Sequence, residues 1–310
     1  MKNVFIVNRS ACDGQAGRFW DSIQAQFLQA IPGSEIRFPD SAVGTQNEAA
    51  QLAQAGPVRL IAVGGEGTMN RIANGIMQAN ADEGVSMALV PFGNVNDYGA
   101  NIGLQKTWQH ALETLRAGKQ ARVGVIRLTA DDKTEYALNI ADVGFGATTA
   151  KSHSVDHQLS WLKGQLKYNM LALKTLLKWR NVPARITVDN EVIMGDVAIL
   201  LAGFSPTLGG FHLVPGATAT ADQFLVTIGL NVQRLKILQL IEDAKRNRLQ
   251  ESNQVLFRKA DRLQIEAEQD LVAEVDGEIL STSCRTVVFE SLPHRLNFVI
   301  PTGSTLLTPE

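Results

Sequence analysis

The sequence predicts an α/β domain built on a parallel sheet, joined to a second, mainly antiparallel β-sandwich domain. Two glycine-bearing loops, at 64–68 and 91–98, each follow a short apolar strand. After Gly118 the alternation of strands and helices gives way to many short strand-like runs separated by turn residues. The chain has 310 residues, 45% of them apolar, and single cores stop growing near ~250 to 300 residues. We therefore expect two domains, at 1–121 and 122–301.

The first expected domain begins with two units of strand, loop and helix. The run Val4–Val7 predicts a buried strand, and the polar loop after it carries Asn8 and Ser10. The run Glu35–Phe38 predicts a second strand, and Thr45 is expected to cap the helix that follows it. Strand and helix continue to alternate to the end of this domain, which is typical of a doubly wound parallel sheet.

The loop at 64–68 has the composition of a phosphate-binding loop. Its residues are Gly64, Gly65, Glu66, Gly67 and Thr68. Three glycines in four positions let the backbone approach a ligand closely, and the next helix directs its first N–H groups toward the loop. The spacing is neither G-x-G-x-x-G nor G-K-[ST], so the common nucleotide motifs do not explain it. A tight strand-to-helix turn without a ligand is the alternative interpretation.

The loop at 91–98 follows a predicted strand at 86–90 and carries three polar candidates for ligand binding. They are Asn94, Asn96 and Asp97. The carboxyl ends of parallel strands meet at one edge of the sheet, where open α/β folds bind ligands. We therefore expect this loop to lie beside the loop at 64–68.

The second expected domain contains short strands and a helix with a basic stripe. The predicted strands cover 122–128, 136–140, 186–188, 197–201, 224–230, 262–265, 287–290 and 296–300. The stripe consists of Lys163, Lys167, Lys174 and Lys178, beside an apolar face of Leu162, Leu166, Met170, Leu173 and Leu177. Such a helix either lies on a membrane surface or packs its apolar face against a sheet and exposes its lysines to water.

Composition limits the partners and the location of the protein. A net charge of -2, from 29 basic and 31 acidic residues, predicts no general attraction to nucleic acid. Two cysteines do not make a disulfide framework, and the first apolar run is too short for a signal peptide. The longest apolar run, 197–204, is far shorter than the ~20 residues of a membrane span. We therefore expect a cytoplasmic protein that reaches any lipid from the membrane surface.

The two loops together resemble the G-G-D-G-T-x-N-E and P-x-G-T-x-N-D-[FY] motifs of the diacylglycerol kinase catalytic domain family. Here they read Gly64-Gly65-Glu66-Gly67-Thr68-Met69-Asn70-Arg71 and Pro91-Phe92-Gly93-Asn94-Val95-Asn96-Asp97-Tyr98. Three later segments resemble further family landmarks in the same order, namely Asn139–Gly146, Leu208–Asp222 and Asp276–Glu278. The resemblance covers nearly the whole chain, and it implies the nucleotide fold that this family shares with NAD kinases.

The resemblance also implies a function. It implies an ATP- and Mg²⁺-dependent kinase that phosphorylates a lipid hydroxyl, with conversion of diacylglycerol to phosphatidic acid as the leading candidate. The residues implied in nucleotide binding are Asn8, Ser10, Thr45, Gly64, Gly65, Glu66, Gly67, Thr68, Asn70, Asn94, Asn96 and Asp97. Glu66 and Asp97 are the carboxylates placed to engage Mg²⁺. A homodimer, transient contact with the inner membrane surface and a return of 302–310 to the first domain are implied as well.

Two further acidic sites follow from the resemblance. In the segment Asp276-Gly277-Glu278, either Asp276 or Glu278 is implied to accept the proton of the lipid hydroxyl. The alternative for this segment is a simple hairpin turn, because Asp-Gly between strands is a hairpin signal. Asp222 resembles a family residue that holds a structural Mg²⁺.

Several positions depart from the family pattern. They are Glu66 in place of Asp, Arg71 in place of Glu, Asn94 in place of Thr, Gly124 in place of Asp and Gln223 in place of Gly. A displacement of about 1 Å at a phosphoryl-transfer site can cost roughly a hundredfold in rate. The second hypothesis is therefore a catalytically impaired family member that binds nucleotide or lipid as a regulator. A third, an NAD kinase, is disfavoured by Asn96-Asp97.

Overall fold

The chain forms two compact units, which we describe separately. The computed structural model describes residues 1–11, 14–81, 84–93, 96–155 and 164–307, with backbone alone at 153–155 and 164–169. Unit 1 consists of Met1–Val125, Thr218–Asp222 and Pro293–Glu310, and unit 2 consists of Ile126–Ala217 and Gln223–Leu292. The sequence predicted the boundary between the domains at 121 and the return of the chain to the first domain at 302, whereas the units divide at 125 and the final return begins at 293.

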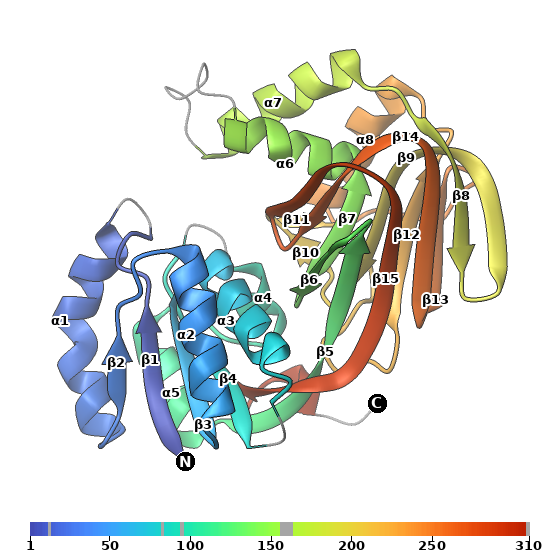
Figure 1. Ribbon diagram of the computed structural model, residues 1–310. Coiled ribbons are helices and arrows are strands. Elements are labelled where there is room, and N and C mark those ends of the chain that lie inside the picture. Colours follow the sequence, from blue (N-terminus) through green and yellow to red (C-terminus); the bar gives the residue numbers. More distant parts are fainter. Residues whose placement is uncertain (12–13, 82–83, 94–95, 156–163, 308–310) are drawn as a thin grey trace. The chain divides into compact units, whose positions relative to one another are not determined.

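Unit 1 contains a parallel sheet with helices on it (Figure 1). Its strands are β1 (Lys2–Val7), β2 (Glu35–Arg37), β3 (Val58–Gly64) and β4 (Val85–Pro91), joined by the last residues of β15 (Glu278–Ile300). Its helices are α1 (Gln15–Ala30), α2 (Ala42–Gln54), α3 (Glu66–Gln78), α4 (Asp97–Asn101), α5 (Trp108–Ala117) and the short η1 (Thr305–Leu307). The strand order is β15-β4-β3-β1-β2, and each of these neighbouring pairs is parallel. This sheet is the predicted doubly wound type.

The register of unit 1 brings three loops to one edge of the sheet. Val7 at the end of β1 lies opposite Val63 of β3, and Val63 lies opposite Val90 of β4. The loops that follow these strands therefore begin side by side. Helices α2 and α3 pack closely at Gly75, where any side chain would collide with the backbone of Gln46.

The start of α2 differs from the expectation. The helix begins at Ala42, and Ser41 is its N-cap, with Ser41 Oγ accepting the N–H of Gly44 at 3.0 Å. Thr45 lies in the first turn and donates its hydroxyl to the Ser41 carbonyl at 3.0 Å. The prediction that Thr45 caps the helix is wrong, because the serine one turn earlier already supplies the side-chain acceptor.

Unit 2 is mainly antiparallel, as predicted. Its strands are part of β5 (Lys119–Ala130), β6 (Lys133–Ala137), β7 (Ile140–Gly144), β8 (Val182–Val188), β9 (Glu191–Gly203), β10 (Thr207–Leu208), β11 (Phe211–His212), β12 (Phe224–Leu230), β13 (Val255–Ala260), β14 (Arg262–Val275) and most of β15. They pair in the order β13-β12-β9-β7-β14-β15, with β8 between β14 and β9 further along those strands. Its helices are α6 (Phe145–Val155), α7 (Gly164–Lys178) and α8 (Arg234–Lys245).

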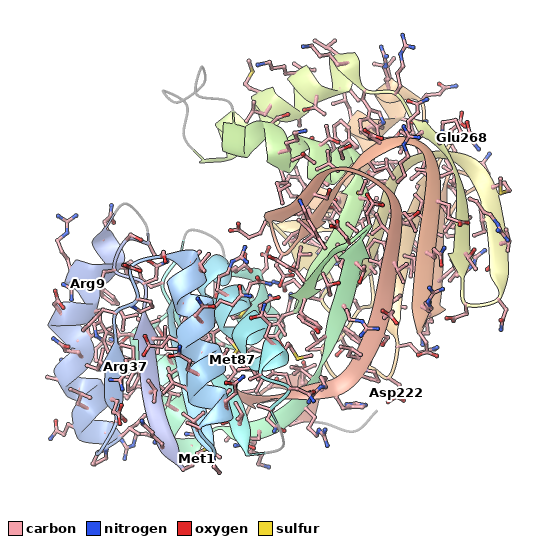
Figure 2. All side chains as sticks on the ribbon, in the orientation of Figure 1. Met1, Arg9, Arg37, Met87, Asp222 and Glu268 are labelled. Atoms are coloured by element: carbon pink, nitrogen blue, oxygen red, sulfur yellow. The ribbon has the colours of Figure 1, made fainter. Side chains whose placement is uncertain are left out.

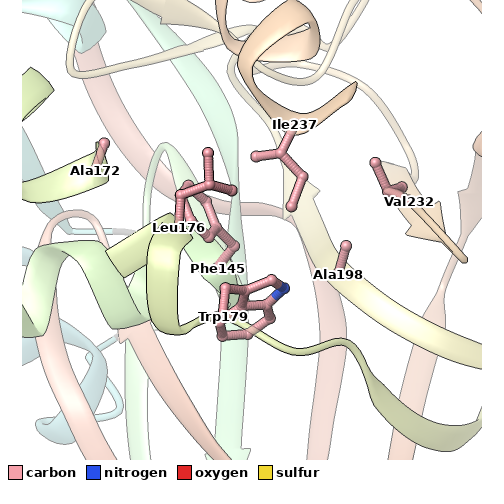
Figure 3. Close-up of a cluster of buried hydrophobic side chains, with 7 residues drawn as sticks. All are labelled: Phe145, Ala172, Leu176, Trp179, Ala198, Val232 and Ile237. Atoms are coloured by element: carbon pink, nitrogen blue, oxygen red, sulfur yellow. The ribbon is translucent and has the colours of Figure 1, made fainter. Parts of the chain in front are cut away.

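The three helices of unit 2 share one apolar cluster (Figure 3). The cluster consists of Phe145, Ala172, Leu176, Trp179, Ala198, Val232 and Ile237. Phe145 and Trp179 meet edge to face, with ring centroids 5.7 Å apart. Phe145 comes from α6 and Ala198 from β9, so the cluster joins the helices to the sheet.

The packed face of α7 is not the predicted apolar face. Leu171, Ala172 and Leu176 are the buried residues, whereas Met170, Leu173 and Leu177 are 43%, 44% and 70% exposed. The expected face at Leu162 and Leu166 lies outside the described side chains. Within the described chain, no helix has both the length and the apolar character needed to cross a membrane.

Candidate functional site

Hydrogen bonds join the three loops at the edge of the unit 1 sheet. Asn8 Nδ2, after β1, donates to Thr68 Oγ1, after β3, at 3.1 Å. The N–H of Phe92, after β4, donates to the Gly64 carbonyl at 2.8 Å. Ser10 joins the same group, because its hydroxyl donates to Asn8 Oδ1 at 2.7 Å. The expectation that the loop at 91–98 lies beside the loop at 64–68 is thus confirmed.

The loop at 64–68 has the geometry of an anion site. Gly65 is the N-cap of α3, and no side chain caps this end of the helix among the described residues. An uncapped helix N-terminus presents backbone N–H groups and a partial positive charge, which favour a phosphate. A Cβ on Gly64 would lie 2.6 Å from Thr68 Oγ1, so a glycine is needed where the loop turns into the helix. These features fit the phosphates of a nucleotide.

Glu66 connects the two glycine-bearing loops. Its Oε1 accepts the N–H of Asp97 at 2.9 Å and the N–H of Tyr98 at 3.2 Å. Glu66 therefore holds the first turn of α4, where Asp97 carries a second carboxylate. Carboxylates supply the oxygen ligands that Mg²⁺ prefers. The longer side chain of Glu66, in place of the family's Asp, is the one that makes these bonds.

The other described residues proposed for nucleotide binding lie either against α4 or within helices α2 and α3. Asn96 lies against α4, where a side chain on Gly99 would collide with its amide. Asn94 lies outside the described residues. Asn70 is fully buried, and its Oδ1 accepts from Asn74 Nδ2 at 3.1 Å. Thr45 is also buried, so both side chains stabilise the helices of unit 1, and their contact with a nucleotide stays a prediction.

In unit 2, the segment Asp276-Gly277-Glu278 forms the hairpin turn between β14 and β15. Asp276 Oδ2 accepts the N–H of Leu138 at 2.8 Å, and its Oδ1 accepts the N–H groups of Asn139 and Ile140 at 2.9 and 3.0 Å. Asp276 is 5% exposed, so these bonds are shielded from water. Because the segment 138–140 turns toward Asp276, the strand predicted over 136–140 is divided between β6 and β7.

The two candidate bases therefore differ in their surroundings. Both oxygens of Asp276 serve buried backbone donors, which leaves that carboxylate poorly placed to receive a proton from a substrate. Glu278 is exposed at the start of β15. The geometry favours Glu278 as the proton acceptor and gives Asp276 a structural task.

Asp222 lies at the surface of unit 1 with a partner of its own (Figure 2). Its Oδ1 lies 2.8 Å from Nε2 of His294, and its side chain is 92% exposed. Arg122 holds His294 in place through a 2.8 Å bond from its Nε to the His294 carbonyl. The described residues contain no group of three acidic, histidine or cysteine side chains arranged for a metal. One exposed carboxylate facing an imidazole does not fit the structural Mg²⁺ that the sequence implied.

Chelation is therefore expected to leave the melting temperature of the wild-type protein unchanged. Asp222 has His294 as its partner, and an exposed pair contributes less than about 1 kcal/mol. The measurement is thermal unfolding with excess EDTA and with excess Mg²⁺, using Asp222→Asn as the matched variant. A stabilisation by Mg²⁺ that the wild type shows and Asp222→Asn lacks would restore the structural metal site.

Two buried acids near the hairpin turn were not predicted from the sequence. Asp142 of β7 and Glu274 of β14 are 3% and 4% exposed. Burial raises the pKa of Asp142 to about 7. Burial and, next, the nearby Asp142 raise the pKa of Glu274 well above its usual range. In the sequence, each of these acids lies inside an apolar run, Asp142 in 140–143 and Glu274 in 271–275, and this pattern could have indicated that they are buried.

A doubly wound unit with an uncapped, glycine-rich helix start and an antiparallel unit with an exposed acidic hairpin are features expected of a two-domain nucleotide-dependent kinase. The chain belongs to the diacylglycerol kinase catalytic domain family. Residues 2–128 match the model of the diacylglycerol kinase catalytic domain, and residues 141–300 match that of the YegS C-terminal NAD kinase beta sandwich-like domain. As a kinase of this family, it uses ATP as its phosphate donor.

Individual relatives agree with this family. A diacylglycerol kinase of Staphylococcus saprophyticus is 27% identical over 264 residues, which cover 81% of this chain and 84% of the relative. A diacylglycerol kinase of Staphylococcus carnosus is 26% identical over 248 residues, which cover 78% of each chain. The crystal structure of a diacylglycerol kinase from Bacillus anthracis superposes with a TM-score of 0.74 at 18% identity, over 98% of each chain. The last similarity shows the fold.

Proposed function

We propose that this kinase transfers the γ-phosphoryl group of ATP to the hydroxyl of diacylglycerol and so forms phosphatidic acid. The observation that carries the proposal is the uncapped glycine-rich start of α3, which presents backbone N–H groups for the phosphates. Glu278, at the hairpin turn of unit 2, is exposed and supplies the candidate base. Both relatives named above are diacylglycerol kinases, which supports this lipid as the substrate.

The proposal assigns each step to residues of this chain. The N–H groups at the start of α3 bind and orient the phosphates, with Thr68 and Asn8 fixing the loop. Glu66 and Asp97 would hold Mg²⁺, which screens the charge of the phosphates when bound. Glu278 accepts the proton of the lipid hydroxyl as that oxygen forms its bond to phosphorus. The bond between the γ-phosphorus and the bridging oxygen breaks, and ADP leaves.

The test is transfer of labelled γ-phosphoryl from ATP into a panel of lipids presented in mixed micelles. The panel contains diacylglycerol, a monoacyl lipid, a sphingoid base and a polyprenol. Label in diacylglycerol alone supports the proposal, and label in another lipid corrects the substrate. Absence of label in every lipid, from protein that still binds ATP, contradicts the proposal and favours the non-catalytic regulator.

The proposal includes a peripheral contact of α7 with the membrane surface, in addition to the homodimer that the family resemblance implies. Met170, Leu173 and Leu177 are exposed on α7, which also carries Lys174 and Lys178. Apolar side chains next to lysines are typical of a helix that lies on an anionic lipid surface. This arrangement supports the membrane-surface interpretation of the helix over the solvated one.

Leu177→Glu is expected to weaken binding to vesicles that contain phosphatidylglycerol by about tenfold or more, because burying a leucine side chain contributes about 2 kcal/mol. Met194→Glu is the matched control, since Met194 is 69% exposed in unit 2 but lies on β9. Sedimentation with vesicles measures the binding. Equal losses in the two variants would contradict the role of α7.

A further inference from the structure

Asp142 and Glu274 lie directly opposite each other on neighbouring strands of unit 2. They occupy the same register position of the antiparallel pair β7 and β14. Directly opposed side chains on one face of a sheet are close neighbours, and like charges there repel. Both side chains are almost completely buried, which adds a large desolvation cost to each charge. Two negative charges at this position are therefore strongly disfavoured.

Each of the two carboxyl groups also holds a backbone donor. Asp142 accepts the N–H of Ala147, in the first turn of α6. Glu274 accepts the N–H of Gly277, the central residue of the turn that carries Glu278. The pair thus connects the start of α6 to the turn that bears the proposed base.

One oxygen of the pair lacks a partner. Asp142 Oδ1 is buried and makes no hydrogen bond with any described residue. A carboxylate can only accept hydrogen bonds, whereas a protonated carboxyl group also donates one. A single proton between Asp142 and Glu274 would give this oxygen a role and remove the repulsion.

We propose that Asp142 and Glu274 share one proton and act as positioning residues that fix the hairpin turn carrying Glu278 against the first turn of α6. The proposal rests on the proposed function only where it names Glu278 as the residue that is positioned.

The charges around the pair are mostly negative. The charged groups that raise the pKa of Glu274 are Asp142, Asp276 and Glu278. On α6, Lys151 donates to the carbonyl of Thr282 at 3.4 Å. Because burial raises the pKa of Asp142 to about 7 and that of Glu274 well above its usual range, the pair still holds a proton at neutral pH and loses it in alkaline solution.

The raised pKa of Asp142 makes the folding stability depend on pH. An acid with a raised pKa in the folded state keeps a proton that the unfolded chain has already released. Folding stability therefore falls as the pH rises from the ordinary aspartate value, 3.8, through about 7. Burial acts on both acids, so the double variant Asp142→Asn/Glu274→Gln, which has no titrating group at either position, removes this dependence.

The first arm of the test measures melting temperature from about pH 5 to about pH 9. It compares wild type, the double variant Asp142→Asn/Glu274→Gln and the control Glu268→Gln, an exposed acid on the same strand (Figure 2). The melting temperature of the wild type and the control should fall with rising pH, while that of the double variant stays nearly constant. Parallel curves for all three proteins overturn the shared proton. Melting temperatures do not depend on catalytic activity, so this arm tests the shared proton even if the proposed kinase reaction is not observed.

The second arm measures kcat and KM against pH with the lipid identified above. The double variant should keep its kcat in alkaline solution, where the wild type loses about tenfold for each pH unit above the pKa of the pair. The KM for ATP should not change, because the pair lies in unit 2. The positioning role is overturned if the melting temperature of the double variant no longer depends on pH but its kcat still falls in alkaline solution as that of the wild type does.

Discussion

Replacing Glu278 by glutamine is expected to lower kcat for phosphoryl transfer by about 10²- to 10⁴-fold. Glutamine has nearly the same shape as glutamate but cannot accept the proton of the lipid hydroxyl. The exposed position of Glu278, next to a turn that Asp276 anchors, leaves its carboxylate accessible to a substrate. Because the nucleotide loops belong to unit 1, the KM for ATP should stay within about twofold of the wild-type value.

Steady-state kinetics with the labelled lipid measures this effect, and thermal unfolding shows that the variant is folded. Glu268→Gln, which removes an exposed carboxylate from β14, is the matched control and should retain wild-type kcat. A Glu278→Gln protein with nearly full kcat would exclude Glu278 as the base.

Replacing Asp276 by alanine is expected to lower the free energy of unfolding by about 3 to 5 kcal/mol, since each buried donor left without a partner costs about 1 to 3 kcal/mol. Three backbone N–H groups, those of Leu138, Asn139 and Ile140, lose their acceptor in this variant. Water cannot replace it easily, because the site is buried.

Asp189→Ala is a well-matched control for Asp276→Ala. Asp189 also has a positive φ, of 49°, at a hairpin turn, and its Oδ1 accepts the N–H groups of Asp261 and Arg262 at 3.1 and 2.8 Å. It is exposed, so water can replace its carboxylate, and we expect a loss of only about 1 kcal/mol. Urea unfolding measures both values. Similar losses in the two variants would show that burial does not determine the contribution of Asp276.

The sequence was sufficient to predict the parts of the site that depend on local conformation. A run of three glycines in four positions between a strand and a helix leaves few choices for the backbone, and the loop at 64–68 has the predicted form. The division into a parallel and an antiparallel unit was also predictable, because the change in element lengths after Gly118 can be read directly from the apolar pattern.

The partners of individual side chains were not predictable, because they come from distant parts of the chain. The backbone N–H groups that donate to Asp276 lie more than 130 positions away from it in sequence, and the pairing of β14 with β7 brings them together. The buried face of α7 is another example. Both possible faces of this helix are apolar, and the sheet and α8 select the one with Leu176.

The last strand of unit 1 has a consequence for how the protein is made. Asn297 and Phe298 of β15 pair with Ser86 and Met87, so they cover the edge of β4. A nascent chain emerging from the ribosome exposes β4 long before these residues exist, and its edge is open to pairing with other chains until they have been synthesised. A premature stop codon before Asn297 would thus damage the sheet of unit 1, although its other strands are translated earlier.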